Sequence, residues 1–281
     1  MLKTNRIELL NLIDRALYED IKDGDLTTNL LIPEDKKATA FIKAKEIGII
    51  AGLPVAEMVF KKLNKNIEYQ IFTEEGNNVA AGEIVAKISG SYRAILTGER
   101  LALNFLQRIS GIATETSKYV DIIKNYKTKI LDTRKTCPGL RILDKYAVKV
   151  GGGSNHRIGL FDMVMIKDNH IEIAGGILNA VKNIKTKISS DIKIEVETKN
   201  LKEVEEALKA NADIIMLDNM SNETMTQAVK LINGEALVEA SGNITKERLI
   251  EIAETGVDFI SVGALTHSVK ALDIGLYIEQ N

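Results

Sequence analysis

The chain has 281 residues and a formal net charge of -2 at pH 7, and its hydrophobic share of 45% and charged share of 27% are ordinary for a globular protein. This length accommodates one large domain or two modest ones, and the near-neutral charge gives no support to nucleic-acid binding. The single cysteine excludes an internal disulfide framework, no apolar run approaches the roughly 18 residues of a membrane span, and the N-terminus lacks a signal-peptide pattern, so we expect a cytoplasmic protein with no membrane partner.

The first part of the chain has the patterns of a mixed α and β region. Apolar residues at helical spacing and short runs of β-forming residues alternate, with glycine turns between them. In chain order we expect a helix over 5–19, an acidic loop over 19–28 that lacks EF-hand spacing, strand structure within 38–50, a helix from Pro54 to Leu63, strands at 67–72 and 83–88, and a long helix over 92–109.

From residue 129 onward, short apolar runs alternate with amphipathic helical patterns, which predicts βα units and a parallel sheet. The apolar runs lie at 129–132, 163–166, 192–197, 213–217, 236–240 and 258–262. Polar residues close them, as active-site residues do at the carboxyl ends of barrel strands. Six runs rather than eight predict an incomplete TIM-like α/β barrel, with 156–160 as a candidate for a short additional strand.

Residues 132–170 concentrate positive charge in a chain whose net charge is negative. The potential cations are Arg134, Lys135, His156, Arg157 and Lys167. Gathering them is repulsive unless an anion lies among them. A solvated basic face is the alternative, but these residues are mostly isolated and adjoin turns and strand-like segments. The pattern therefore favours an anion-binding site.

Two acids stand at predicted strand ends, Glu197 and Asp218. The two-residue period of a strand puts Glu195 on the same face as Glu197, with Glu197 nearer the barrel mouth. The residues alone leave three interpretations open: a general acid and base, a Mg²⁺ site on a phosphorylated substrate, or a pair of salt-bridged structural acids.

Two late loops have the pattern of phosphate sites. Ser241 and Gly242 precede a helix expected to start near Thr245, where free N–H groups and the helix dipole favour an anion. Gly263 opens a similar loop that runs to His267. Late loops of TIM barrels often bind phosphate.

Several segments, in this order, carry a family resemblance. They are Gly24-Asp-Leu-Thr-Thr28, Asp132-Thr-Arg-Lys-Thr136, Lys149-Val-Gly-Gly-Gly-Ser-Asn-His-Arg-Ile-Gly-Leu160 and Met165-Ile-Lys-Asp-Asn-His170. They resemble the quinolinate phosphoribosyltransferase family, and the resemblance covers nearly the whole chain. It implies transfer of the phosphoribosyl group of phosphoribosyl pyrophosphate to quinolinate with decarboxylation. The products are nicotinate mononucleotide, pyrophosphate and CO₂, in NAD biosynthesis. A Mg²⁺ cofactor and a homodimer are also implied.

The resemblance also implies the role of each candidate residue. For quinolinate these are Arg100, contributed to the neighbouring subunit's site, and Arg134, His156, Arg157 and Lys167. For phosphoribosyl pyrophosphate they are Lys135, Glu197, Asp218, Ser241, Gly242, Gly263 and His267. Lys135, Glu197 and Asp218 are expected to be catalytic, and Glu197 and Asp218 to bind the metal directly or through water.

The expected organisation is an α+β N-terminal open-sandwich domain over 1–106, a barrel over 107–267, and a C-terminal helix over 268–281 packed on the first domain. Three other functions stay open at this point. One is a phosphoribosyltransferase of the same fold acting on another heterocyclic acid. Another is a Schiff-base barrel aldolase that uses Lys135 or Lys167. The last is a non-catalytic anion-binding protein.

Overall fold

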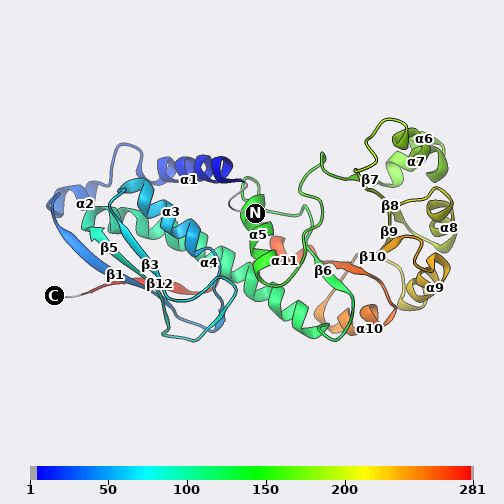
Figure 1. Cartoon of the computed structure of the whole chain (residues 1–281). Helices are drawn as coiled ribbons and strands as arrows, with labels where there is room; N and C mark the ends of the chain where they lie inside the picture. The colour runs from blue at the N-terminus through cyan, green and yellow to red at the C-terminus, as the bar shows by residue number, and fades with distance from the viewer. Residues whose placement is uncertain (1–4, 280–281) are drawn as a thin grey trace. The chain divides into compact units, whose positions relative to one another are not determined.

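The computed structural model describes residues 5–279 and divides into two compact units (Figure 1). The first unit combines the chain up to Ser117 with 136–152 and with the segment from Leu265 onward, and the second comprises 118–135 and 153–264. The boundary expected at 106/107 falls inside a single helix, α4 (Tyr92–Ile122). No helix among residues 5–279 combines the length and the apolar character that crossing a membrane requires.

The first unit is built on a four-stranded antiparallel sheet in the order β12-β1-β5-β3. Its strands are β1 (Lys37–Ala44), β3 (Glu68–Ile71), β5 (Ile84–Ser91) and β12 (Ile274–Ile278), and β2 (Gly48–Ile49) pairs separately with β4 (Asn78–Val79). Its helices are α1 (Arg6–Ile21), α2 (Leu26–Leu31), α3 (Leu53–Leu63), α5 (Arg141–Val150), most of α11 (Ala264–His267) and the greater part of α4. Burial alternates along β1, so one face of this sheet contributes to the core.

The C-terminal helix expected over 268–281 is wrong. Residues 274–278 form β12, which pairs antiparallel with β1. The segment Ile-Gly-Leu-Tyr-Ile contains β-branched and aromatic residues and a glycine, and it fits a pleated surface better than a helix. The segment does pack on the N-terminal sheet, but as an added strand. Residues 280–281 of the expected helix lie outside the described residues.

The Gly24–Thr28 signature has a structural role that explains its residue types. Asp25 is the N-cap of α2, and its side chain accepts a 2.9 Å hydrogen bond from the backbone N–H of Thr28. The hydroxyl of Thr97 donates to the other oxygen of Asp25 at 3.1 Å. The acidic residue at this position therefore satisfies a free N–H group at the start of a helix, as side-chain caps do.

The second unit is a six-stranded parallel sheet in the order β6-β11-β10-β9-β8-β7. The strands are β6 (Lys129–Leu131), β7 (Val164–Ile166), β8 (Ile194–Thr198), β9 (Ile214–Asp218), β10 (Leu237–Ser241) and β11 (Phe259–Ser261). The helices are α6 (Asp168–Ala174), α7 (Ile177–Lys185), α8 (Leu201–Lys209), α9 (Asn222–Ile232), the short η1 (Lys246–Arg248) and α10 (Leu249–Glu254). Helices α7 to α10 lie outside the curved sheet (Figure 1). The expected six-stranded incomplete barrel is confirmed.

The additional strand expected at 156–160 is wrong. Residues 156–160 form no strand, and just before them Ser154 makes an isolated bridge to Leu131, the last residue of β6. The N–H groups of Ile158 and Gly159 instead donate to the carboxylate of Asp162, at 2.7 and 2.8 Å. The Asp162 side chain thus accepts the hydrogen bonds that the carbonyl groups of a neighbouring strand would otherwise accept.

The length of α4 leads to a stability prediction. This helix extends beyond the expected 92–109 and contains two interior glycines, Gly98 and Gly111. A Cβ at Gly111 would lie 2.2 Å from the backbone oxygen of Lys270, whereas at Gly98 it would meet only side-chain atoms of Leu63 and Phe60, at 2.9 Å. Alanine gains up to about 1 kcal/mol over glycine in a helix, but overpacking against backbone costs about 1–3 kcal/mol.

We therefore expect Gly111→Ala to lower the free energy of unfolding by about 2 kcal/mol and Gly98→Ala to change it by less than about 1 kcal/mol. Urea unfolding followed by circular dichroism measures both variants. Because the two sites share the same helix, equal effects would contradict the assigned contact between Gly111 and Lys270.

Candidate active site

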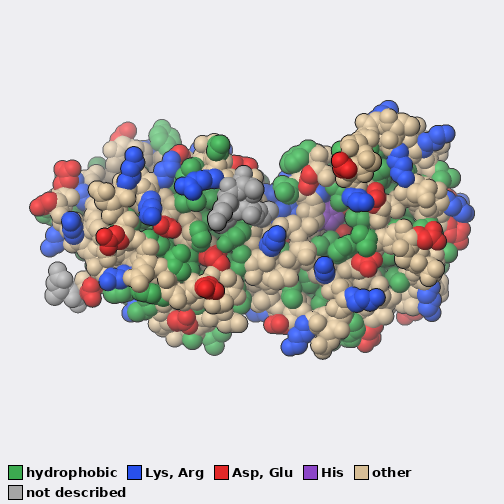
Figure 2. Space-filling view, in the orientation of Figure 1, with side chains coloured by type: hydrophobic (Ala, Val, Ile, Leu, Met, Phe, Trp, Pro, Cys, Tyr) green, Lys and Arg blue, Asp and Glu red, His purple; other side chains and the backbone are tan. Residues whose placement is uncertain are grey.

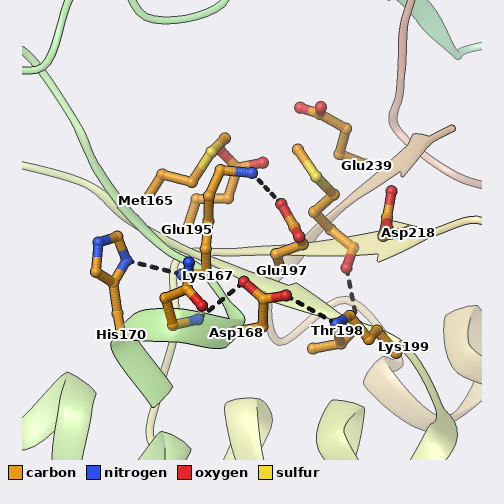
Figure 3. A network of polar contacts seen from close by, with 12 residues as sticks. Met165, Lys167, Asp168, His170, Glu195, Glu197, Thr198, Lys199, Asp218 and Glu239 are labelled. Carbon is orange, nitrogen blue, oxygen red and sulfur yellow. Dashed lines mark hydrogen bonds and ion pairs between the residues drawn. The ribbon is translucent and has the colours of Figure 1, made fainter. Parts of the chain in front are cut away.

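The carboxyl ends of the parallel strands carry most of the predicted residues of the second unit (Figure 3). Lys167 follows β7, Glu197 belongs to the end of β8, and Asp218 and Ser241 end β9 and β10, where they are register partners. Figure 3 shows that Glu195, Glu197, Asp218 and Glu239 project to the same side of the sheet. Parallel register therefore assembles one polar surface from residues far apart in sequence.

Two ion pairs tie the end of β7 to the end of β8. Lys167 forms an ion pair with Glu197, and Asp168 forms one with Lys199 at 3.0 Å (Figure 3). The hydrogen bond and charge of Lys199 lower the pKa of Asp168. The backbone N–H of Lys167 also donates to His170 Nδ1 at 3.0 Å. Lys167 is thus held beside a carboxylate of the next strand.

The Ser241–Asn243 turn packs on the residue that follows Asp218. Asn219 donates from Nδ2 to Asp218 Oδ2 at 3.1 Å and accepts from Asn243 at 3.0 Å. Gly242 has a φ of +94°, and a Cβ there would lie 2.3 Å from Asn219 Oδ1. Glycine is therefore required at position 242 for the two loops to approach. Asn219 was not predicted as a site residue, although an asparagine directly after a strand-ending acid could have drawn attention to it.

Arg134 and Arg157 carry charge that the protein itself only weakly satisfies. The Nε atom of Arg134 is buried without a hydrogen-bond partner among residues 5–279. Among residues 5–279, the guanidinium of Arg157 donates to Met163 O at 3.2 Å and to the Met165 sulfur at 3.5 Å. Burial lowers the pKa of Arg157, and repulsion from Arg134 adds to that effect. Two neighbouring guanidinium groups of this kind are suited to bind an anion through bidentate hydrogen bonds.

His156 lies beneath this surface, between two buried carboxylates. Its Nε2 is 2.9 Å from Glu195 Oε2 and 3.4 Å from Glu239 Oε2. Burial alone would lower the pKa of His156, but the two carboxylates raise it to about 10. Burial raises the pKa of Glu195 to about 7, and Glu239 adds to that rise while His156 opposes it. The two carboxylates therefore favour a proton on Nε2, the ring nitrogen that faces them. Glu239 was not predicted, because it reads as part of a core strand.

The remaining predicted residues are at the surface or in the other unit. Lys135 is exposed in the second unit, and its N–H donates to Thr133 at 3.0 Å. Gly263 belongs to the second unit, whereas Arg100 and His267 are exposed residues of the first. The ring of His267 contacts the Ser268 hydroxyl at 2.8 Å. The second unit thus contains every predicted residue except Arg100 and His267.

The oxygen ligands at the strand ends fit a hard divalent cation. Mg²⁺ usually takes one or two carboxylates and completes its octahedron with water and substrate phosphates. Glu197 and Asp218 are partly exposed carboxylates on neighbouring strands β8 and β9. Over the visible face, acidic and basic side chains are interspersed rather than gathered in one basic patch (Figure 2).

An incomplete α/β barrel with cations and carboxylates at its strand ends defines an enzyme of anionic substrates. Residues 25–110 match the family described as quinolinate phosphoribosyl transferase, N-terminal domain, and 112–277 match its C-terminal domain. The chain therefore belongs to the quinolinate phosphoribosyltransferase family.

Similar proteins agree with this assignment over nearly their whole length. A probable carboxylating nicotinate-nucleotide pyrophosphorylase of Synechocystis is 48% identical, with 96% of this chain and 92% of that protein covered. Its Bacillus subtilis counterpart is 44% identical, with coverage of 97% and 94%. The structure of the nicotinate-nucleotide pyrophosphorylase from Francisella tularensis superposes with a TM-score of 0.92 at 47% identity, covering 97% of this chain and 96% of that one.

Proposed function

We propose that the chain transfers the phosphoribosyl group of phosphoribosyl pyrophosphate to quinolinate and releases pyrophosphate and CO₂, with nicotinate mononucleotide as the product. The observation that carries the proposal is that two sets of groups occur in the same barrel unit. One set is the guanidinium groups of Arg134 and Arg157, which have few hydrogen-bond partners, and the other is the strand-end carboxylates of Glu197 and Asp218. One set suits a dianion, and the other suits a metal-bound ribose phosphate.

Quinolinate is a pyridine dicarboxylate, and arginine forks match its carboxylates in plane and charge. Arg134, Arg157 and Lys167 bind it from this chain, with His156 beneath Arg157. Each charge-assisted hydrogen bond contributes roughly 1.5–3 kcal/mol. Lys167 is paired with Glu197 here, and an ammonium has three donors, so Lys167 can bind a substrate carboxylate while it keeps this partner.

The phosphoribosyl side is assigned to the later strand ends and to Lys135. Ser241, Gly242, Gly263 and His267 bind the phosphate through hydroxyl, ring and backbone N–H groups. Glu197 and Asp218 hold Mg²⁺, directly or through water. When bound, Mg²⁺ neutralises charge on the departing pyrophosphate. Lys135 adds positive charge on the same side.

Bond breaking follows from this arrangement. As the bond from the anomeric carbon to pyrophosphate breaks, positive charge develops on the ribose, and Glu197 and Asp218 stabilise it electrostatically. The pyridine nitrogen donates its electron pair to that carbon. The resulting pyridinium accepts the electron pair left on the ring carbon when the adjacent carboxylate leaves as CO₂, and a proton then replaces it. The substrate itself thus serves as the electron sink.

The competing functions are less well supported. A Schiff-base aldolase needs a lysine that is free to attack a carbonyl, but Lys167 is held in an ion pair with Glu197. Lys135 is exposed and lacks the apolar pocket that activates a nucleophilic lysine. Incubation of the protein with quinolinate and phosphoribosyl pyrophosphate, with product analysis by mass spectrometry, tests the proposal. If nicotinate mononucleotide does not form and the phosphoribosyl group is transferred to another heterocyclic acid, that acid replaces quinolinate as the proposed substrate.

Arg157→Lys is expected to lower kcat/KM for quinolinate by about 10- to 100-fold, because lysine keeps the charge but lacks the planar fork. Arg157→Ala should be inactive while it retains its circular dichroism spectrum. Arg93→Lys, a conservative change in the first unit, serves as the control. A lysine variant with near-normal kcat/KM would show that Arg157 makes no bidentate contact.

Activity is expected to require a divalent cation, and Asp218→Asn should raise KM for phosphoribosyl pyrophosphate by about tenfold or more, because the amide is a weaker metal ligand. Quinolinate binding, followed by calorimetry, should change little. Full activity in excess chelator would refute the metal role. An unaltered Asn variant would refute the assignment of Asp218.

We also propose a homodimer in which Arg100 acts in the neighbour's site. The six-stranded sheet has open edges at β6 and β7, and an incomplete barrel of this kind favours a two-fold partner. Arg100 is an exposed residue of the unit that does not contain the strand-end cluster. An arginine from a second copy would complete the set of cations for a dianion.

Arg100→Ala and Arg157→Ala homodimers should each be nearly inactive, but refolding them together should restore activity. A hybrid dimer has one site that lacks both arginines and one that is intact. Random mixing makes about half of the dimers hybrid, so activity should return to roughly a quarter of wild type. Native mass spectrometry verifies hybrid formation. Hybrids without activity would place Arg100 in its own subunit's site or outside both.

A further inference from the structure

The cluster formed by His156, Glu195 and Glu239 is buried to an unusual degree for three titratable side chains. Glu195 is 0% exposed and Glu239 1% exposed, and the side chain of His156 is 7% exposed. The His156 ring nitrogen Nε2 approaches both carboxylates, at 2.9 Å from Glu195 and 3.4 Å from Glu239. Two buried carboxylates that rely on one imidazole are costly, and an apolar replacement would suit simple packing better.

A metal ion is one candidate partner for this cluster. The ligand atoms of the three residues lie within 4.8 Å of one another, which is the spacing of a metal site. However, the backbone N–H of Arg157 donates to His156 Nδ1 at 2.8 Å. Because Nδ1 accepts, the proton of the ring lies on Nε2 and faces the carboxylates. A metal would need the electron pair of Nε2, so the geometry favours a proton-bridged cluster.

That same hydrogen bond connects the cluster to Arg157. The backbone of His156 is fixed independently, because its N–H donates to the buried Asp132 at 2.9 Å. In the described part of the chain, the Arg157 guanidinium itself is held by a carbonyl and a thioether. Arg157 is repelled by Arg134 and attracted by Glu195. The position of Arg157 is therefore supported by the hydrogen bond from its own backbone N–H to the His156 ring.

We propose that Glu195 and Glu239 are positioning residues that fix Arg157 for the substrate carboxylate by holding the His156 ring. The inference rests on the proposed function, in which Arg157 binds quinolinate. His156 then acts through Arg157, since both of its ring nitrogens face groups of the protein. The two glutamates come from β8 and β10, so the orientation of the His156 ring depends on the barrel strands as well as on the loop that contains His156 and Arg157.

Glu195→Gln and Glu239→Gln test this role, because glutamine keeps the shape and removes the charge. We expect KM for quinolinate to rise by about tenfold in each, whereas kcat and KM for phosphoribosyl pyrophosphate change by less than about threefold. Loss of a buried negative charge would by itself strengthen attraction for a dianion. A lowered KM would therefore show that the glutamates act only as background charge and would overturn the inference.

A stability control separates positioning from folding. Thr128→Val removes a buried 2.8 Å hydrogen bond to Val257 O beside the amino end of β6, away from the strand ends that carry the site. It should lower Tm without changing KM for quinolinate. If the glutamine variants behave in the same way, with a lower Tm and an unchanged KM, the cluster is only structural and the inference is wrong.

A double-mutant cycle with His156→Asn tests whether the glutamates act on Arg157 through the His156 ring. Asparagine places a polar atom near the Nδ1 position but is too short to reach the glutamates. Glu239→Gln should then cause no further rise in KM, and additive effects would overturn the route through His156. Wild-type turnover of quinolinate is measured first. If it is absent, the proposed function fails and the inference fails with it; if it is present and the variants match wild type, only the inference fails.

Discussion

The active site depends on how the open side of an incomplete barrel is closed without a strand. Residues 153–163 lead from the β6 edge, where Ser154 bridges Leu131, to the start of β7. Their backbone N–H groups need partners, and carboxylates supply them: Asp132 for His156, and Asp162 for Ile158 and Gly159. The loop is therefore rigid where it presents Arg157, although it is not part of the sheet.

Charge balance is the second constraint on this region. Neighbouring cations repel one another, and the chain offsets this repulsion with carboxylates placed on the same side of the sheet. Lys167 is paired with Glu197, and Glu195 attracts Arg157 from below. The mouth of the barrel can thus hold several cations without an anionic ligand among them.

Much of this architecture could be predicted from the sequence, and the failures have physical causes. The six strands and the polar residues at their ends were predictable because each strand is a short apolar run closed by a polar residue. The strand expected at 156–160 failed because Asp162 satisfies the backbone locally. The C-terminal helix failed because β1 offers an edge that local pattern does not show. Glu239 was missed because its partner, His156, comes from a distant segment.

The two glutamates of β8 show why position along a strand decides a role. Glu195 and Glu197 share one face, two residues apart, yet the Glu195 side chain is fully buried while that of Glu197 is 13% exposed. In the proposed mechanism the outer carboxylate serves the metal or the ribose, because water and ligands can reach it. The inner carboxylate is enclosed by protein, where it lies 2.9 Å from His156 Nε2 and attracts Arg157. Under the proposed roles, one strand therefore supplies both a group for the phosphoribosyl substrate and a group that keeps the substrate-binding arginine in place.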